Sequence, residues 1–344
     1  MGSRRRIGVV TAGGDAPGLN AAIRGVGRTG LDEGDEVIGI LNGWTGLLEE
    51  GGHRALTAED FSGIVARGGT ILGSSRTAPL NDDEGMSRLL AGIDRVGLDA
   101  LVAIGGDGTL ALARRLSERG ARVVGIPKTI DLDVANTDVC IGFDSALATV
   151  VEALDRLHTT AASHHRVMVL ETMGRDTGWL ATLGGLAGGA DVICIPEFVI
   201  SISEVAARLD ARRHAGKLSS IVVVAEGARI EGLVEHAVPL DEAGHPLLAR
   251  RAIGEAVATA IEALIGAETR ATVLGYLQRG GAPVATDRVW ASRMGATAAK
   301  MARTAGPDAV AVCEGHVVAS SLAALTERRR LVHERLYELC KVVG

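Results

Sequence analysis

The chain has 344 residues, of which 47% are hydrophobic, 23% charged and 2% aromatic, and its formal net charge is −6. The negative charge and the scarcity of aromatic side chains argue against a nucleic-acid-binding protein. No apolar run is long enough to span a membrane, and the start Met1–Arg6 lacks the apolar core of a signal peptide, so we expect a cytoplasmic protein without a membrane partner.

Apolar strands and helices alternate along the chain. Continuous apolar runs predict strands at residues 6–11, 36–41, 101–104, 122–126, 166–171, 191–195, 220–225, 271–277 and 309–313. Helices are predicted at residues 21–29, 110–116, 146–162, 179–186, 203–214, 249–265, 286–304 and 321–339. A surface loop or hairpin is predicted at residues 232–246. This alternation predicts an α/β protein with mostly parallel sheets, and the chain length favours two lobes.

Glycine-rich segments follow several of the predicted strands. The first, Ala12–Asn20, contains Gly14 and leads from a strand into a helix. Another, Gly68–Thr77, is rich in glycine and hydroxyl groups and carries Arg76. Taken alone, the first turn fits a phosphate-binding loop and a tight packing turn equally well.

The segment from Ile104 to Thr109 combines three glycines with one acid. A strand that turns through glycines into a helix directs backbone N–H groups and the positive end of the helix dipole at one spot, which suits a phosphate. Asp107 is expected to hold Mg²⁺ against phosphate oxygens, the alternative being a turn aspartate that caps the helix. Gly108 leaves space where a phosphate chain would pass.

The next loop carries two carboxylates, Asp131 and Asp133, one residue apart. This spacing predicts that both lie on the same side of an extended loop. One can accept a proton from a hydroxyl while the other orients it, as phosphoryl transfer requires. The alternative is a solvated acidic loop. Lys128, just before it, either neutralises phosphate charge or is an ordinary surface lysine.

Other polar residues gather where apolar strands end, and open α/β sheets bind ligands outside the carboxyl ends of their strands. Arginines are the natural ligands of phosphate. Those that lie at strand ends or in glycine-rich loops are Arg76, Arg166, Arg175, Arg270 and Arg279.

Together these segments resemble the bacterial phosphofructokinase family over nearly the whole chain. The matching segments are residues 13–21, 105–109, 127–131, 173–175, 268–275, 278–281 and 287–288. Gly-Gly-Asp-Gly-Thr alone also occurs in other kinases, but the series in this order is specific. The resemblance implies two Rossmann-like lobes with mostly parallel sheets and an active site in the cleft between them.

The same resemblance implies Mg²⁺-dependent transfer of a phosphoryl group from ATP to the 1-hydroxyl of fructose 6-phosphate, a step of glycolysis. Asp131 would be the catalytic base, with Asp133 and Thr129 beside it, and Asp107 the Mg²⁺ ligand. Arg175 would also stabilise charge in the transition state.

Binding residues are implied in the same way. The phosphoryl donor would be lined by Gly14, Arg76, Thr77, Gly106, Asp107, Gly108, Thr109 and Lys128. The sugar phosphate would be held by Thr129, Asp131, Met173, Gly174, Arg175, Glu226, Tyr276 and Arg279. Arg166 and Arg270 would reach the 6-phosphate from a neighbouring subunit, which requires a homo-oligomer, a tetramer or a dimer. The donor lobe would comprise residues 1–141 and 278–326, and the sugar-phosphate lobe residues 142–277 and 327–344.

Two positions give conflicting indications about the donor. Lys128 stands where ATP-using members commonly carry glycine and pyrophosphate-using members carry lysine. Gly108 matches the ATP type, because pyrophosphate users typically have aspartate there. A carboxylate at position 108 would repel the α-phosphate of a nucleotide, whereas a lysine can assist either donor. We therefore expect ATP, with pyrophosphate as the alternative.

Two further positions depart from the family pattern. Leu132 stands where asparagine is usual between the two acids, and Tyr276 replaces a common histidine. These departures keep open another acceptor, such as sedoheptulose 7-phosphate. They also keep open a catalytically weak protein that senses phosphosugars or nucleotides.

Overall fold

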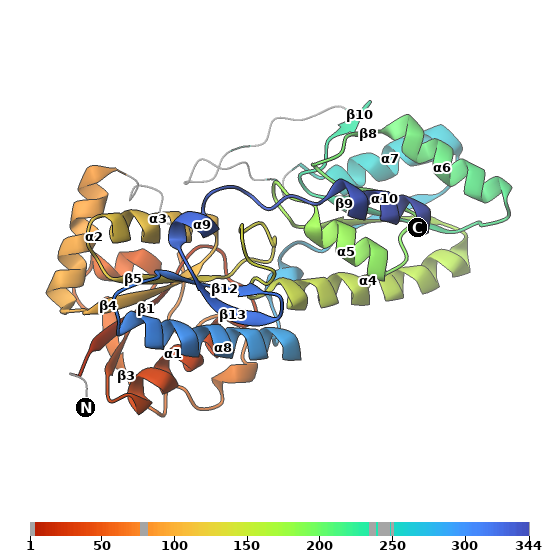
Figure 1. The fold of residues 1–344 in the computed structure, drawn as a ribbon. Coiled ribbons are helices and arrows are strands. Elements are labelled where there is room, and N and C mark those ends of the chain that lie inside the picture. Colours follow the sequence, from red (N-terminus) through yellow and green to blue (C-terminus); the bar gives the residue numbers. More distant parts are fainter. Residues whose placement is uncertain (1–3, 76–81, 234–238, 240–247, 249–250, 344) are drawn as a thin grey trace. The chain divides into compact units, whose positions relative to one another are not determined.

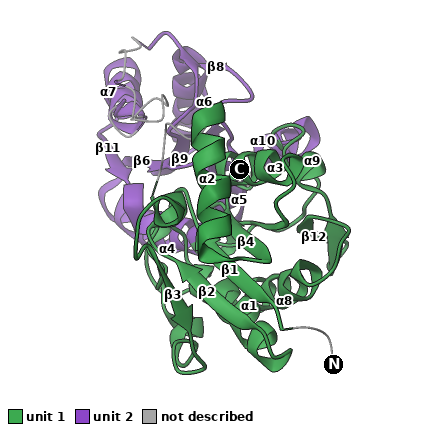
Figure 2. Cartoon of the chain, turned by 90° about the vertical axis from the view of Figure 1, so that its left-hand side faces the viewer, with its two compact units in different colours: residues 1–145, 242–244, 279–330 green, residues 146–241, 245–278, 331–344 purple. Residues whose placement is uncertain are grey.

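The structure is a computed structural model that describes residues 4–75, 82–233, 239, 248 and 251–343 (Figure 1). Two compact units make up the chain (Figure 2). Unit 1 comprises residues 1–145, 242–244 and 279–330, and unit 2 residues 146–241, 245–278 and 331–344. Within the described ranges, every helix is too short or too polar to cross a membrane. Arg76, Thr77 and most of the predicted loop at 232–246 lie outside the described residues.

Unit 1 is built on a seven-stranded sheet in the order β13-β12-β5-β4-β1-β2-β3. Its strands are β1 (Arg6–Thr11), β2 (Glu36–Ile40), β3 (His53–Leu56), β4 (Ala100–Gly105), β5 (Val123–Pro127), β12 (Ala309–Cys313) and β13 (His316–Ser320). The five inner strands run parallel, whereas β3 and β13 pair antiparallel at the edges. The mixed sheet confirms the predicted α/β class.

Helices cover both faces of this sheet (Figure 1). They are α1 (Leu19–Asp32), α2 (Asp83–Val96), α3 (Asp107–Glu118), α8 (Ala285–Ala302) and α9 (Leu322–Leu325), with short 3-10 turns η1 (Gly43–Leu47) and η2 (Ile64–Ala66). α1 and α8 cross on one face, where a Cβ on Gly25 would lie 2.5 Å from the carbonyl oxygen of Ser292. On the other face, side chains of α3 and α9 pack over Gly125.

Unit 2 contains a fully parallel four-stranded sheet in the order β11-β6-β9-β7. Its strands are β6 (Val167–Thr172), β7 (Val192–Cys194), β9 (Ser220–Ala225) and β11 (Thr269–Val273), with a separate pair of β8 (Ile200–Ser201) and β10 (Ile230–Glu231). The helices are α4 (Phe143–His164, which begins in unit 1), α5 (Trp179–Ala187), α6 (Ile202–His214), α7 (Ile253–Ile265) and α10 (Glu334–Val343). Apolar residues of α6, α7 and the sheet form one core.

Three predicted elements are wrong. The strand predicted at 271–277 begins at Thr269 and ends at Val273, because Gly275 takes a positive φ of 49° and starts the 3-10 turn η5 (Gly275–Arg279). The helix predicted at 249–265 begins only at Ile253, after a left-handed residue at position 252.

The third wrong element is the terminal helix predicted at 321–339. It is divided into α9 and α10, because the chain between them pairs with another segment. Arg329 forms an antiparallel bridge with Val134, and the backbone N–H of Arg330 donates to the carbonyl of Asp133 at 2.8 Å. The sequence also failed to predict α2 and the edge strands β3 and β13.

Candidate active site

The carboxyl ends of β1, β4 and β5 lie side by side in the sheet of unit 1. The parallel register pairs Thr11 with Ile104 and Gly105 with Pro127. The loops that follow these strands therefore emerge at one edge of the sheet, where doubly wound folds bind ligands. These loops carry both predicted catalytic carboxylates and the predicted donor-binding residues other than Arg76 and Thr77, which lie outside the described residues.

The first loop turns at Gly14, which two cations from distant segments hold in place. The ammonium group of Lys128 donates to the carbonyl oxygen of Gly14, and Arg279 Nη1 donates to the carbonyl oxygen of Asp15 at 3.0 Å. A Cβ on Gly14 would displace the Arg279 guanidinium from its present position. Only 3% of Lys128 is exposed, which rules out an ordinary surface lysine.

The second loop leads directly into α3. Gly106 precedes the helix, and Asp107 is its first residue, with its Oδ1 accepting the N–H of Gly108 at 2.7 Å. A Cβ on Gly108 would meet nothing within 4 Å, so the space in front of the helix N-terminus is open. Thr109 is buried in the first turn. This end of α3 offers a helix dipole and open space to an anion.

The third loop contains Asp131 and Asp133 and is not extended, contrary to the prediction. Leu132, between them, has a φ of 52°, in the left-handed region that leucine rarely adopts. The backbone N–H of Asp131 donates to Thr129 Oγ1 at 3.0 Å. Asp133 is only 6% exposed, so the loop is not simply a solvated acidic segment.

Negative charge is concentrated around Asp133. Burial, followed by the charges of Asp131 and Asp107, raises the pKa of Asp133 to about 7, while the charge of Arg329 opposes this rise. Its buried Oδ1 finds no hydrogen-bond partner among the described residues. The site therefore brings three carboxylates close enough to perturb one another and places an arginine beside them.

Asp107 suits a Mg²⁺ ion that is shared with a ligand. The described residues contain no group of three or more His, Cys, Asp or Glu side chains arranged to hold a metal by themselves. Mg²⁺ commonly takes one or two protein carboxylates and completes its shell with phosphate oxygens and water. The side chain of Asp107 is 46% exposed at the open end of α3, and its neighbours supply negative charge. These features fit such a shared ion.

In unit 2, the carboxyl ends of β6 and β9 carry four of the predicted sugar-phosphate residues, which are Met173, Gly174, Arg175 and Glu226. The register pairs Thr172 with Ala225, so the Met173–Arg175 turn and Glu226 follow neighbouring strands. The backbone N–H of Arg175 donates to Glu226 Oε1 at 3.1 Å. Arg175 itself has a φ of 53°, a strained backbone conformation that the carboxylate of Glu226 helps to hold.

Gln278 supports this turn, although the sequence assigned it no role. The backbone N–H of Met173 donates to Gln278 Oε1 at 3.2 Å, and Gln278 Nε2 donates to the carbonyl of Gly275 at 3.0 Å. Gln278 is fully buried. Its place in the segment 278–281, which matches the family, was the one sequence feature that could have indicated a role.

Tyr276, another predicted sugar-phosphate residue, is 72% exposed.

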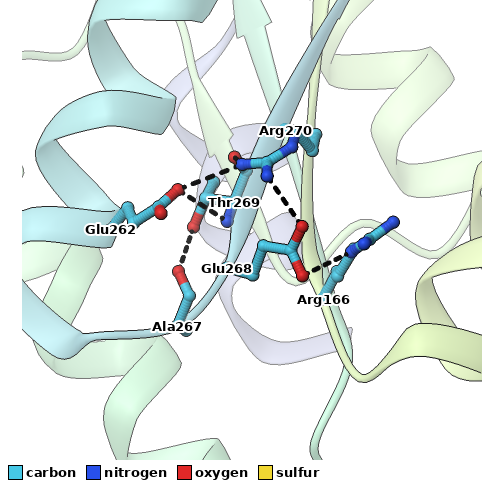
Figure 3. Close-up of polar contacts among 6 residues, drawn as sticks. All are labelled: Arg166, Glu262, Ala267, Glu268, Thr269 and Arg270. Carbon is cyan, nitrogen blue, oxygen red and sulfur yellow. Dashed lines mark hydrogen bonds and ion pairs between the residues drawn. The ribbon is translucent and has the colours of Figure 1, made fainter.

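Arg166 and Arg270 are brought together by a glutamate (Figure 3). Glu268 forms an ion pair with Arg166, whose Nε lies 2.8 Å from Oε2, and its Oε1 accepts a hydrogen bond from Arg270 Nη2 at 2.7 Å. Arg270 Nη1 also lies 3.3 Å from Glu262. The hydrogen bond from Arg166 and the two positive charges lower the pKa of Glu268. Guanidinium groups bind phosphate oxygens as they bind carboxylates, so this pair of arginines suits a phosphate.

These two arginines lie far from the Met173–Arg175 turn within unit 2. Arg166 immediately precedes β6, and Arg270 pairs with Met168 near the start of that strand, whereas the turn follows its end. At about 3.3 Å per residue, the two ends are roughly 20 Å apart. One sugar phosphate therefore cannot contact both groups in a single copy of unit 2.

A family model and curated relatives match most of the chain. A family model described as Phosphofructokinase matches residues 6–302. The chain is 48% identical over 307 residues to an ATP-dependent 6-phosphofructokinase of Chloroflexus aggregans, covering 87% of this chain and 84% of that protein. It is 45% identical over 341 residues to a pyrophosphate–fructose 6-phosphate 1-phosphotransferase of Amycolatopsis methanolica, covering 98% and 99% respectively.

Solved structures share the fold. The structure matches phosphofructokinase from Pichia pastoris in the T-state with a TM-score of 0.83 and 33% identity, covering 95% of this chain and 36% of that one. It matches the pyrophosphate-dependent phosphofructokinase of Marinobacter aquaeolei with a TM-score of 0.81 and 22% identity, covering 96% and 86%, a likeness of fold alone.

Proposed function

Because the chain belongs to the phosphofructokinase family, we propose that it is an ATP-dependent 6-phosphofructokinase. It transfers the γ-phosphoryl group of ATP to the 1-hydroxyl of fructose 6-phosphate and so acts in glycolysis, in the cytoplasm. The observation that carries the proposal is the set of carboxylates Asp107, Asp131 and Asp133 beside the open N-terminus of α3. Phosphoryl transfer uses these parts together, a cradle for the phosphates, an acid that holds Mg²⁺ and a carboxylate that orients the attacking hydroxyl.

In this mechanism, Asp131 accepts the proton of the 1-hydroxyl while the sugar oxygen bonds to the γ-phosphorus and ADP leaves. The hydrogen bond from Asp131 N–H to Thr129 Oγ1 fixes the base within its loop. Asp133, buried behind it, limits how far that loop can move. Arg175, held by Glu226, neutralises charge on the transferred group.

The phosphoryl donor binds to the loops of unit 1 in this proposal. We assign its binding to Gly14, Gly106, Gly108, Thr109 and Lys128, at or near the N-terminus of α3. Arg76 and Thr77, outside the described residues, stay predicted donor ligands. Asp107 would hold Mg²⁺, which when bound screens the phosphate charges. The open space at Gly108 supports ATP, since a nucleotide needs room for its α-phosphate.

Pyrophosphate is the second candidate donor. Lys128 favours it, because pyrophosphate-using members of the family carry lysine at this position, and its ammonium group is buried at the donor loop. Relatives with 45–48% identity carry names of the pyrophosphate-dependent enzyme as well as the ATP-dependent one, so overall similarity supports both donors.

The acceptor site is proposed to need a second copy of the chain. Met173, Gly174, Arg175, Glu226, Tyr276 and Arg279 would bind the sugar, and Arg166 and Arg270 would bind the 6-phosphate of a sugar held by a neighbouring subunit. The separation of about 20 Å between these groups within unit 2 supports this arrangement. A homotetramer or homodimer would satisfy it.

The decisive experiment is a coupled assay of purified protein with fructose 6-phosphate and Mg²⁺, supplied first with ATP and then with pyrophosphate. We expect turnover with ATP. Turnover with pyrophosphate alone would reject ATP as the donor. Binding of ligands without turnover would favour a sensing protein, and sedoheptulose 7-phosphate in place of fructose 6-phosphate tests the acceptor.

A further inference from the structure

Arg329 lies beside the proposed donor site although the sequence placed it in a helix. The antiparallel bridge to Val134 and the hydrogen bond from Arg330 to the carbonyl of Asp133 fix the backbone of Arg329 and of the residue after it. Asn136 Nδ2 also donates to the carbonyl of Ala324 at 2.8 Å. The C-terminal segment is thus tied to the chain that follows the catalytic loop.

The Arg329 side chain faces the carboxylates of the site. Its Nη2 lies 3.8 Å from Asp107 Oδ2, and its charge acts on Asp133 as well. The Arg329 side chain is 43% exposed and the Asp107 side chain 46%, so the pair lies at the open rim, where an incoming ligand can reach it. The open space at Gly108 adjoins Asp107 in the same helical turn.

From this placement we propose that Arg329 is a donor-binding residue that neutralises Asp107 in the empty site and binds the donor's phosphates when the donor arrives. The inference rests on the proposed function, because it assumes that a phosphate donor binds at α3. Without a counter-charge, the three carboxylates would repel a polyanion. The Arg329 guanidinium can leave Asp107 and bind a phosphate of the donor instead, which reduces this electrostatic repulsion.

The test is calorimetric titration of the full chain with ATP, without sugar phosphate, once with Mg²⁺ and once in EDTA. Arg329→Gln should weaken ATP binding about tenfold, the effect expected for one charge-assisted hydrogen bond, and more in EDTA than with Mg²⁺. Arg328→Gln is the matched control, because it removes the same charge from the exposed neighbouring residue and should change binding less than twofold. Arg329→Lys keeps the charge and should recover part of the affinity.

A second variant tests the exchange itself. Asp107→Asn should tighten ATP binding in EDTA, because it removes a repelling carboxylate and releases Arg329. In the Arg329→Gln background no guanidinium is left to release, so Asp107→Asn should there change ATP binding by a clearly different factor, a non-additivity that only coupled residues show.

Equal effects of Arg329→Gln and Arg328→Gln would overturn the proposal, as would additive effects of the double variant. If the wild type binds pyrophosphate but not ATP, the same comparisons apply with pyrophosphate, and binding of neither donor rejects the inference. An Arg329 effect on ATP binding in a protein that fails to phosphorylate fructose 6-phosphate would support this inference while rejecting the proposed function.

Discussion

Leu132 explains at the scale of one residue why the loop between the two acids is bent. Its φ of 52° lies in a region that glycine and asparagine tolerate far better than leucine does. Asparagine, the residue expected from the family resemblance, would adopt this conformation readily. Leucine does so while burying its side chain, which is only 4% exposed. Apolar burial therefore offsets backbone strain at this position.

We predict that Leu132→Gly is more stable than Leu132→Ala by about 1 kcal/mol. Both variants lose the buried side chain, so the pair isolates the cost of a positive φ. In a helix or strand the order would be reversed. Urea unfolding measures both free energies, and a more stable alanine variant would contradict the left-handed conformation of residue 132.

Asp131 should be essential for turnover but not for binding. We expect Asp131→Ser to lower kcat by about 10²- to 10⁴-fold, the usual contribution of a general base, while fructose 6-phosphate still binds. Steady-state kinetics and calorimetric titration check the two parts separately. Nearly normal turnover would remove Asp131 as the base.

Gly108 should decide which donor is used. A side chain fits there without meeting the protein, so Gly108→Asp should fold normally. Its carboxylate should reduce kcat/KM with ATP more than with pyrophosphate, because only ATP brings an α-phosphate. Gly108→Asn, which has the same shape without the charge, separates repulsion from steric exclusion. Equal losses with both donors would refute the argument.

At the scale of an element, helix α4 is capped by a residue from α8. Asp287 accepts the N–H groups of Gly142 and Ser145, both at 2.8 Å, and the Ser145 hydroxyl at 2.6 Å. Helix N-termini leave N–H groups that need such acceptors. Asp287 is fully buried, and burial raises its pKa to about 6 despite these hydrogen bonds.

The raised pKa of Asp287 has a defined consequence for stability. Between about pH 4 and pH 6 the folded chain holds this proton and the unfolded chain does not, so stability from this group falls as pH rises through that window. Relative to Asp287→Asn, the wild type should lose about 2 kcal/mol from pH 4 to pH 7. Urea unfolding across this range checks it. A wild type that gains stability instead would mean that the helix hydrogen bonds outweigh burial.

The sequence predicted those strands correctly that are buried on both faces of a sheet. β1, β4, β6 and β9 are buried along nearly their whole length and were predicted within a residue or two. The edge strands β3 and β13 are partly exposed and give no continuous apolar run. The C-terminal helix was predicted too long because its apolar spacing continues through residues that pair with Asp133 and Val134.

At the scale of the whole molecule, the chain contains two separate sets of proposed phosphate ligands. Those of unit 1 surround the N-terminus of α3. Those of unit 2 are divided between the two ends of β6, with Arg166 at one end and Arg175 beyond the other. The assignment of the two lobes to donor and acceptor, with their boundaries, stays a prediction.

Shared active sites predict complementation between inactive variants. Asp131→Ser subunits and Arg270→Ser subunits, co-expressed with different tags and purified as mixed oligomers, should recover activity that neither has alone. Mixed oligomers of Asp131→Ser and Asp107→Asn should not, because both variants damage the same half of the site. No recovery in the first mixture would mean that Arg270 does not serve a neighbouring subunit.

The sequence by itself determined the α/β class, the positions of most strands along the chain and the loops that carry the chemistry. Glycines after apolar runs, and acids after glycines, are local patterns that can be recognised without knowledge of the fold. Only the tertiary structure decided what those residues meet. Lys128 reaches Gly14, and Arg329 reaches Asp107 from more than two hundred residues away in the chain. Contacts of that kind depend on strand order and loop packing, so the sequence near either residue does not predict them.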